Sequence, residues 1–493
     1  MASSNGLIQG DCLNRNAGLE PLDLTVEEES AVYTSMCPRN GSSPMWCYGN
    51  TCIVRVDEQV FVSGQEKLEQ SEPLNDCRWT LYRNSGQSWE LQQADAEGRT
   101  REPCPLAILP GKRLFLSSNP TLLGPDVAGG GPARPEVLAF DACSPRSTYR
   151  TLLPKWEGSP AFSEHSYRSF AADASNGELI LFQNVGYSHA EWALRCDLAE
   201  WHSGRLMWPP YTNDRMTPYG ATHVRVNYPV ALLRDRAVHF CGVAAFDTWS
   251  RVNTPELAGR RYGNRFRCLY YAWTDDVTTS DFSAWIEIDN TFDDGGWVFA
   301  GDMHLGQEGV VHLVWYRAPI NKRFRDEHFP DITRRYAICY ARLLKGRVIH
   351  REILVEAGEG LSAEIPTDID AESSVLPWKI KDKPVVEDPI STPRFHVTPD
   401  GRLFVIYYVS GTSSDGTTVS ENRILEIGAD GSHSAPVTIP AAYPLTEFFT
   451  ATPRAGCEPS YTVDLLGYRK GDFGLFTNTP TSVSYMRVRL AQQ

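Results

Sequence analysis

The sequence predicts an all-β fold, namely a seven-bladed β-propeller of four-stranded antiparallel blades. A hairpin-like phrase recurs seven times along the 493 residues, a further pair of strands follows six of these hairpins, and helical periodicity is nearly absent. Four antiparallel strands that repeat about one axis are the pattern of a propeller. We therefore expect residues 1–493 to form a single domain whose ring is closed by strands from the two chain ends.

The repeated hairpin is predicted to supply the two inner strands of each blade. It combines a short apolar strand, a turn that contains Gly or Asp, and a second apolar strand. Glycine at such turns allows the positive φ angles that short hairpin loops require. The hairpins lie at residues 51–64, 106–118, 169–184, 228–243, 297–316, 394–411 and 461–479.

The outer strands of each blade are predicted to follow its hairpin. In the seventh unit only one further strand, at residues 483–492, precedes the end of the chain. A strand within residues 19–35 would complete that blade, so the N-terminal segment 1–45 is predicted to supply it and to cover the open sheet edge. Residues 24–33 are alternatively compatible with one or two helical turns. The six complete outer pairs lie at residues 77–93, 136–154, 192–209, 266–288, 336–355 and 422–440.

Length and strand spacing leave other architectures open. At roughly 150 residues per domain the chain would hold about three domains, and two β-sandwiches would also show short strands at regular spacing. A sandwich, however, gives no reason for a sevenfold repeat of hairpin and strand pair. In addition, the segment N-S-G-Q-S-W at residues 84–89 resembles the Asp-box that joins the third and fourth strands of sialidase-type blades. It lies at that place in the first unit.

The composition excludes several classes of protein. A formal net charge of −14 disfavours a sequence-independent nucleic-acid binder, and no stretch approaches the roughly 20 apolar residues of a membrane helix. The N-terminal residues have neither the basic region nor the apolar core of a signal peptide. The protein is therefore expected in the cytoplasm, or in a secreted or periplasmic location after removal of a signal.

The 12 cysteines are predicted to be mostly buried free thiols, because a chain of this size needs no disulfides. Those at positions 37, 47 and 52 could form a bridge or part of a zinc site, although their spacing is not CxxC. No cofactor is required by the sequence. A structural calcium or zinc ion would be compatible with such a propeller, but no cluster of ligands demands one.

Chemistry-bearing side chains are predicted to gather on one face of the disc. The chain enters the inner strand and leaves the second strand of every blade on that face, which we call the mouth. The two insertions that leave second strands there, at 244–265 and 317–335, are rich in Arg, which suits an anionic ligand. Further candidates on the mouth are Trp46, Tyr48, Glu164, His165, Tyr167, Arg168, Tyr187, His189, Tyr219, His223, Arg225, Tyr228, Asp247, Trp249, Tyr316, Arg317, Arg394, His396, Tyr408 and Arg454.

The histidines divide by position. His239 and His312 lie within apolar strands and are predicted core residues, while His304 lies beside a turn on the opposite face. His165 and His189 instead flank the inner hairpin of one blade and are expected to approach each other at the mouth. Arg225 and Tyr228 begin the next blade and are expected beside them.

A resemblance to a known family rests on residues 164–189, E-H-S-Y-R-S-F-A-A-D-A-S-N-G-E-L-I-L-F-Q-N-V-G-Y-S-H. This segment resembles the H-N-x-P…D-x-x-G…F…H segment of seven-bladed BNR-type propellers. That family includes ulvan lyases, rhamnose–glucuronate lyases and rhamnosidases. The rhythm of residues 309–316 and 392–408 is similar to the same repeat. The chain departs from the family at Ser166, where the family has Asn.

The resemblance implies a polysaccharide lyase that cleaves an anionic, uronic-acid-containing polysaccharide or oligosaccharide by β-elimination. Such an enzyme neutralises the C6 carboxylate, removes the C5 proton and protonates the leaving oxygen. His165 would then be the acid/base, with His189 assisting it or binding the carboxylate, and Arg225 would neutralise the carboxylate. Tyr228 or Tyr219 would be the second acid/base if a nearby cation lowers the tyrosine pKa. The implied substrate-binding residues are Tyr167, Arg168, Tyr219, His223, Trp249, Tyr316, Arg317, Arg394 and Trp46.

Two other functions remain open. A glycoside hydrolase could use Glu164 and Asp247 as paired acids. In a sialidase-like version Arg225, Arg394 and Arg454 would form an arginine triad, and in a further version His304 would act alone from the opposite face. A non-catalytic sugar-binding propeller would use tryptophans such as Trp46 and Trp249 for stacking. Lectin propellers usually repeat one site in every blade, whereas the polar set here is concentrated in the third to sixth blades.

Overall fold

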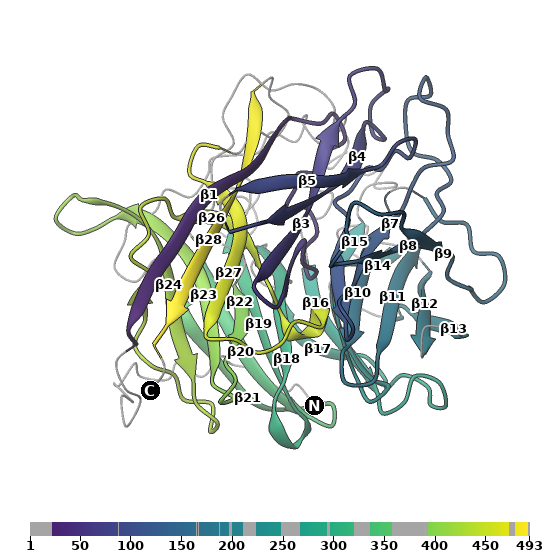
Figure 1. Cartoon of the computed structure of the whole chain (residues 1–493). Coiled ribbons are helices and arrows are strands. Elements are labelled where there is room, and N and C mark those ends of the chain that lie inside the picture. Colours follow the sequence, from purple (N-terminus) through teal and green to yellow (C-terminus); the bar gives the residue numbers. More distant parts are fainter. Residues whose placement is uncertain are drawn as a thin grey trace, which may run out of the picture.

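The computed structural model describes residues 22–86, 88–163, 165, 167–186, 188–196, 200–210, 223–247, 267–292, 296–319, 336–356, 390, 393–472 and 479–491. Within these residues the strands form seven antiparallel sheets of four strands each. The protein is thus a seven-bladed β-propeller, as the repeated hairpins predict (Figure 1).

The first four blades follow the predicted order of an inner hairpin and an outer strand pair. Blade 1 consists of β2 (Ile53–Val56), β3 (Gln59–Lys67), β4 (Cys77–Asn84) and β5 (Trp89–Ala94). Blade 2 consists of β6 (Leu106–Leu109), β7 (Arg113–Ser118), β8 (Glu136–Asp141) and β9 (Arg150–Leu152). Blade 3 consists of β10 (Arg168–Asp173), β11 (Glu178–Val185), β12 (His189–Cys196) and β13 (Glu200–Met207). Blade 4 consists of β14 (His223–Arg234), β15 (Ala237–Asp247), β16 (Arg267–Thr274) and β17 (Ile286–Asn290).

The last three blades complete the ring. Blade 5 consists of β18 (Gly296–Leu305), β19 (Val310–Pro319), β20 (Ala337–Leu344) and β21 (Arg347–Glu356). Blade 6 consists of β22 (Arg394–Val397), β23 (Leu403–Thr412), β24 (Thr418–Ile427) and β25 (Val437–Thr438). Blade 7 consists of β26 (Leu445–Thr450), β27 (Thr462–Arg469), β28 (Pro480–Leu490) and β1 (Leu24–Met36).

The inner strands line the axis and join the blades. Each of β2, β6, β10, β14, β18, β22 and β26 contacts the inner strand of the next blade, and β26 also contacts β2. Every residue of β6 and of β22 is buried, because neighbouring blades cover both faces of these strands. A strand that is covered on both faces has a short continuous run of apolar residues, without alternating polar ones. These runs are the pattern by which the sequence predicts the hairpins.

The N-terminal strand closes the ring. β1 runs antiparallel to β28 from the Leu24–Leu490 pair to the Met36–Pro480 pair (Figure 1, purple beside yellow). The predicted outer strand from the N-terminal segment is therefore confirmed, and helical turns at 24–33 are wrong. Pairing with β28 satisfies the backbone groups that an open edge would expose.

The predicted inner hairpin of the seventh blade, 461–479, is wrong. Its inner strand is β26, which precedes β27 by a long connection instead of a tight turn. That connection contains the short 3-10 turn η4 (Pro453–Ala455), which contacts the inner strands of blades 2, 3, 4 and 5 and so lies across the axis. Because the connection joins an inner strand to a second strand, it lies on the face opposite the mouth.

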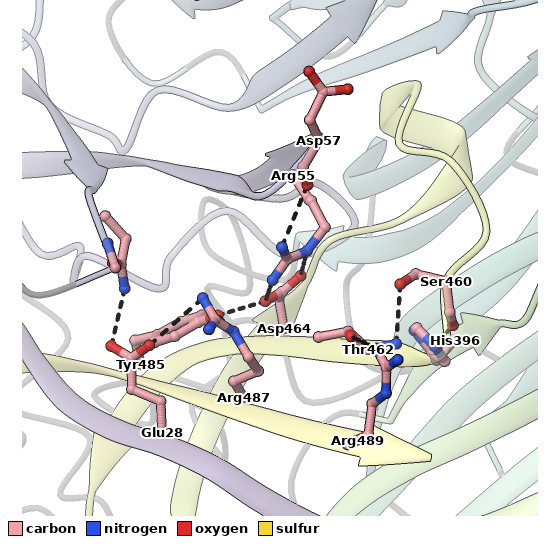
Figure 2. Close-up of polar contacts among 12 residues, drawn as sticks. Glu28, Arg55, Asp57, His396, Ser460, Thr462, Asp464, Tyr485, Arg487 and Arg489 are labelled. Carbon is pink, nitrogen blue, oxygen red and sulfur yellow. Dashed lines mark hydrogen bonds and ion pairs between the residues drawn. The ribbon is translucent and has the colours of Figure 1, made fainter. Parts of the chain in front are cut away.

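Polar contacts reinforce the closure between blades 7 and 1. Arg55 on β2 donates to both carboxylate oxygens of Asp464 on β27, each at 2.6 Å. Tyr485 on β28 donates to the same carboxylate at 2.5 Å, and Arg487 lies 3.5 Å from Glu28 on β1. Figure 2 shows Arg55 and Tyr485 pointing to Asp464, with Glu28 and Arg487 farther along the same seam.

The Asp-box-like turn has the predicted place between the third and fourth strands of blade 1. Asn84 accepts a hydrogen bond from the amide of Gly86 at 2.7 Å, and Gly86 has a φ of 86°. Trp89 packs edge-on against Tyr485 at 5.1 Å and donates to Ser30 at 3.0 Å. The turn therefore also fastens blade 1 to blade 7.

The eleven described cysteines are free, and only Cys143 among them is exposed. The prediction of buried free thiols is confirmed for the four cysteines in apolar strands, Cys196, Cys241, Cys268 and Cys339. In the part of the chain that the structure describes, no helix is long and apolar enough to cross a membrane.

Candidate functional site

A short turn before β2 builds one side of the mouth. Asn50 pins this turn to blade 3, since its side chain donates to the carbonyl of Arg168 and accepts from the amide of Phe170, both at 2.8 Å. Gly49 has a φ of 79°, and a Cβ there would lie 2.4 Å from the Pro229 carbonyl oxygen in blade 4. Only glycine allows that approach. The pinned turn presents Trp46 and Tyr48 toward the blades opposite.

An aromatic wall spans blades 1, 3, 4 and 5. Its centre is Tyr228, whose ring lies 5.8 Å from Trp46, 5.2 Å from Tyr48, 4.9 Å from Tyr167 and 5.6 Å from Phe299. Tyr316 stacks on the far side of Phe299 at 5.1 Å. A cavity opens against this wall, lined by Trp46, Cys47, Tyr48, Asn50, Glu102, Pro103, Tyr167, Arg168, Tyr228 and Pro229.

His165 contacts two of the residues that line this cavity, Glu102 and Tyr167. Its Nδ1 lies 2.5 Å from Oε1 of Glu102, and its ring centre lies 4.3 Å from that of Tyr167. Burial lowers the pKa of His165 from its ordinary value of 6.5, and Arg101 and Arg225 lower it further against the opposing effect of Glu102. The ring is therefore neutral at pH 7.

Glu102 is buried and ionised. Burial by itself would raise its pKa, but His165, Arg168 and Arg101 outweigh burial and lower the pKa of this carboxyl below 4.5. Glu102 directly precedes the inner hairpin of blade 2, so it obeys the same topological rule as the other mouth residues. Sequence reasoning missed it because it assigned no chemistry to that blade.

The surroundings of Tyr228 keep its hydroxyl group protonated. Burial raises its pKa well above 10, and the lowering effect of Arg267 is smaller. The residue has a φ of 50° and sits at a bulge between Asn227 and Val230, where the strand turns its ring into the wall. The condition that a cation lowers the pKa of this tyrosine is thus not met.

Two arginines border the wall. Arg225 lies over the ring of Tyr167 at 5.1 Å. Arg267, at the start of β16, lies 4.3 Å from the ring centre of Trp297 and 4.2 Å from that of Phe299. Arg267 is buried, and its Nε and Nη1 atoms have no hydrogen-bond partner among the described residues. Sequence reasoning missed Arg267, because it considered only the ends of inner hairpins.

His189 occupies a separate position on blade 3. Its Nδ1 lies 2.7 Å from the Ser188 hydroxyl and its Nε2 lies 2.9 Å from Glu191, which also accepts from Arg205 at 2.7 Å. Among the described residues no contact joins His189 to His165. Each of the two histidines contacts a carboxylate of its own, and their expected approach stays a prediction.

Three predicted mouth arginines are engaged by the protein itself. Arg168 donates to the Pro103 carbonyl, and Arg317 pairs with Asp289 of blade 4 at 2.9 Å. Arg394 donates to the carbonyls of Phe448 and Gly301 at 3.0 and 2.5 Å, although it also borders a second small cavity beside Tyr48. These contacts fasten neighbouring blades to one another.

Arg454 is not on the mouth. It belongs to the turn η4 on the opposite face, where it pairs with buried Asp302 at 2.6 Å. The error follows from the misassigned inner strand of blade 7. The Arg454 guanidinium shares Asp302 with the amide of Phe395, the neighbour of Arg394, so the triad of residues 225, 394 and 454 stays a prediction.

His239 and His312 are buried core residues, as predicted. His239 bonds Tyr271 at 2.6 Å, and His312 bonds Tyr340 at 2.7 Å. His396 bonds the Ser460 carbonyl at 2.7 Å, which removes it from the mouth set. His304 packs near His312, with ring centres 6.1 Å apart.

Several predicted residues lie where their side chains are not described. Glu164, Tyr187, Tyr219 and Trp249 lie outside the described residues. His223 and Asp247 are backbone partners at the mouth end of β14 and β15. Their roles stay predictions.

Comparison with known proteins yields only distant likenesses. No protein-family model and no curated protein matches the chain. The solved structures of similar shape include the polysaccharide lyase Uly1, at 10% identity and a TM-score of 0.46 over 95% of this chain and 100% of that one. They also include the α-L-arabinofuranosidase Arb93A from Fusarium graminearum, at 10% identity and a TM-score of 0.42 over 94% of this chain and 98% of that one. The seven-bladed fold is established by the strand pairing and does not depend on these likenesses.

The geometry brings together His165, Tyr167, Arg225, Tyr228 and Trp46 from the predicted set, and adds Glu102 and Arg267. Through Tyr167, a neutral imidazole and a cation both adjoin the aromatic wall. Such a set can move a proton next to a bound anion.

Proposed function

We propose that this protein is a polysaccharide lyase that cleaves an anionic, uronic-acid-containing polysaccharide or oligosaccharide by β-elimination. One observation carries the proposal: the neutral His165 stands beside a wall that holds the two cations Arg225 and Arg267. An imidazole that is uncharged at pH 7 can accept a proton, and cations nearby can stabilise an anion formed from a carboxylate-bearing sugar.

The proposed reaction assigns these groups as follows. The guanidinium groups of Arg225 and Arg267 bind the C6 carboxylate, so that the C5 proton becomes more acidic. His165 takes this proton through its imidazole, the C5 electron pair forms the C4–C5 double bond, and the C4–O4 bond breaks. The leaving O4 takes up a proton, which His165 can return or Tyr167 can donate. Every step uses side chains of this chain, so no cofactor is required.

Hydrolysis is the alternative reaction. By paired acids it needs two carboxyl groups across the scissile bond, and the candidates Glu164 and Asp247 lie where side chains are not described, while Glu102 is bonded to His165. In a sialidase-like site Arg454 would have to bind the substrate, whereas here it pairs with buried Asp302. Among the described residues, no group of three or more His, Cys, Asp or Glu is placed to hold a metal ion. The reaction proposed here does not depend on a structural calcium or zinc ion.

The decisive experiment incubates the protein with uronic-acid polysaccharides and follows the ultraviolet absorbance of the unsaturated product. We expect absorbance to rise together with new reducing ends. His165→Ala should abolish both, while His433→Ala, a change on the outer edge of blade 6, should leave them unchanged.

Two outcomes would overturn the proposal. New reducing ends without the absorbance would identify a hydrolase. Binding of the polysaccharide with neither signal would identify a sugar-binding propeller.

A further inference from the structure

We propose that Glu102 is a positioning residue that holds His165 with its proton on Nδ1 and leaves Nε2 as the proton acceptor. The inference rests on the proposed function for its catalytic meaning, but the proton position can be measured without any substrate. Neither residue type nor spacing points to this pairing, because 63 positions separate the two side chains.

The geometry allows one arrangement of protons. Glu102 is ionised, so its oxygen accepts and the imidazole nitrogen 2.5 Å away must donate. A neutral imidazole has a single N–H, and that proton is then on Nδ1. Nε2 has no partner among the described residues, and the side chain is 21% exposed. The acceptor nitrogen is therefore the one left for a substrate.

The surroundings hold Glu102 in this role. The carboxylate is buried, and the cations Arg168 and Arg101 both favour its charged form. Arg168 is itself fixed by the carbonyl of Pro103, next in sequence to Glu102. A buried carboxylate that is already held by cations keeps its charge and its orientation while the histidine beside it gains and loses a proton.

The charged groups that the structure describes around His165 set its expected pH dependence. Arg101 and Arg225 disfavour the imidazolium, and Glu102 favours it. Removing the carboxylate therefore lowers the pKa of His165 further. The acid limb of the activity profile would move to lower pH, while loss of the fixed tautomer would lower the rate.

The first test measures the imidazole directly. Nitrogen NMR of histidine-labelled protein, with the His165 signal assigned from His165→Gln, should show the Nδ1–H tautomer at pH 7. In Glu102→Gln the amide can donate or accept, so the Nε2–H form should appear. Glu191→Gln, which alters the matching carboxylate of His189, should leave the His165 signals unchanged. An unchanged tautomer in Glu102→Gln would overturn the inference.

The second test measures the reaction. Glu102→Gln should lower kcat about 100-fold with little change in KM, and should shift the acid limb of kcat downward in pH. Glu426→Gln, which breaks a buried pair with Arg402 on blade 6, controls for general loss of stability. A fall in rate with no shift of the limb and no change of tautomer would show a structural role only. If no lyase activity is found in the parent protein, the tautomer measurement still decides the inference, while the proposed function fails.

Discussion

At the scale of single residues, the chemistry of the mouth depends on what each side chain contacts. His165 and His189 each face a carboxylate, yet only His165 adjoins the aromatic wall. Arg394 and Arg317 are engaged by the protein itself, whereas Arg267 keeps two guanidinium nitrogens without partners among the described residues. Residue type alone does not distinguish these cases.

Arg267 is expected to lower the stability of the protein and to raise its activity. A buried guanidinium with two nitrogens that lack hydrogen-bond partners among the described residues costs free energy. Arg267→Met should therefore raise the urea midpoint of unfolding by an amount equivalent to about 1–2 kcal/mol. The same change should lower kcat/KM for an anionic polysaccharide about 100-fold, because a cation near the carboxylate is lost. Arg402→Met, which removes a paired cation on blade 6, should lower the midpoint instead. An Arg267→Met protein that is less stable than its parent would contradict this account.

At the scale of elements, joints between blades carry the structure. The closure between blades 7 and 1 depends on Asp464, which binds Arg55 and Tyr485 across three strands. Asp464→Ala should cost about 3–5 kcal/mol of unfolding free energy, because it leaves a largely buried guanidinium unpaired.

A matched surface pair provides the control for Asp464. Lys112 and Asp57 are 2.8 Å apart but both are exposed. Lys112→Ala should therefore leave the urea midpoint essentially unchanged. Equal effects of the two substitutions would show that the closure is not a stabilising joint.

The turn across the axis should tolerate no side chain at Gly456. This residue has a φ of 86°, and a Cβ would lie 1.8 Å from the Ile108 carbonyl oxygen of β6. Gly456→Ala should cost more than about 3 kcal/mol or prevent folding, since both strain and overlap with fixed backbone apply. Gly416→Ala has the same φ but no atom within 4 Å, so only the backbone strain of about 1–2 kcal/mol should appear in its urea midpoint.

At the scale of the whole molecule, the buried histidines predict sensitivity to acid. Burial lowers the pKa of His239 to about 4, of His312 to about 3 and of His396 to about 4. Below pH 6.5 these histidines bind protons in the unfolded chain but not in the folded protein. The free energy of unfolding therefore falls as the pH falls from 6.5 toward the lowered pKa values. Each ring contributes about 1.4 kcal/mol per pH unit, or about 4 kcal/mol for the three.

Urea unfolding at pH 7, 6 and 5 measures this slope. We expect the free energy of unfolding to drop steeply below pH 6.5, and His239→Gln to reduce that decline by about 1.4 kcal/mol per pH unit. Stability that does not change between pH 7 and 5 would show that these rings are protonated in the folded state.

The sequence by itself determined the ring. Buried apolar runs and glycine turns specify strands and hairpins locally, so six of the seven inner hairpins and the N-terminal outer strand followed from pattern. The seventh failed because β26 and β27 are joined by a long connection that no hairpin signal marks. His165, Tyr167 and Arg225 were found because topology alone places the starts of inner strands on one face.

Only the tertiary structure decided which of these residues act together. The pairing of Glu102 with His165 joins two blades, and the contacts of Arg267 with Trp297 and Phe299 join two more. Contacts of this kind depend on how loops of separate blades meet at the mouth. A local pattern of apolar and polar residues encodes strand and turn conformation. It does not specify which side chains of neighbouring blades contact each other.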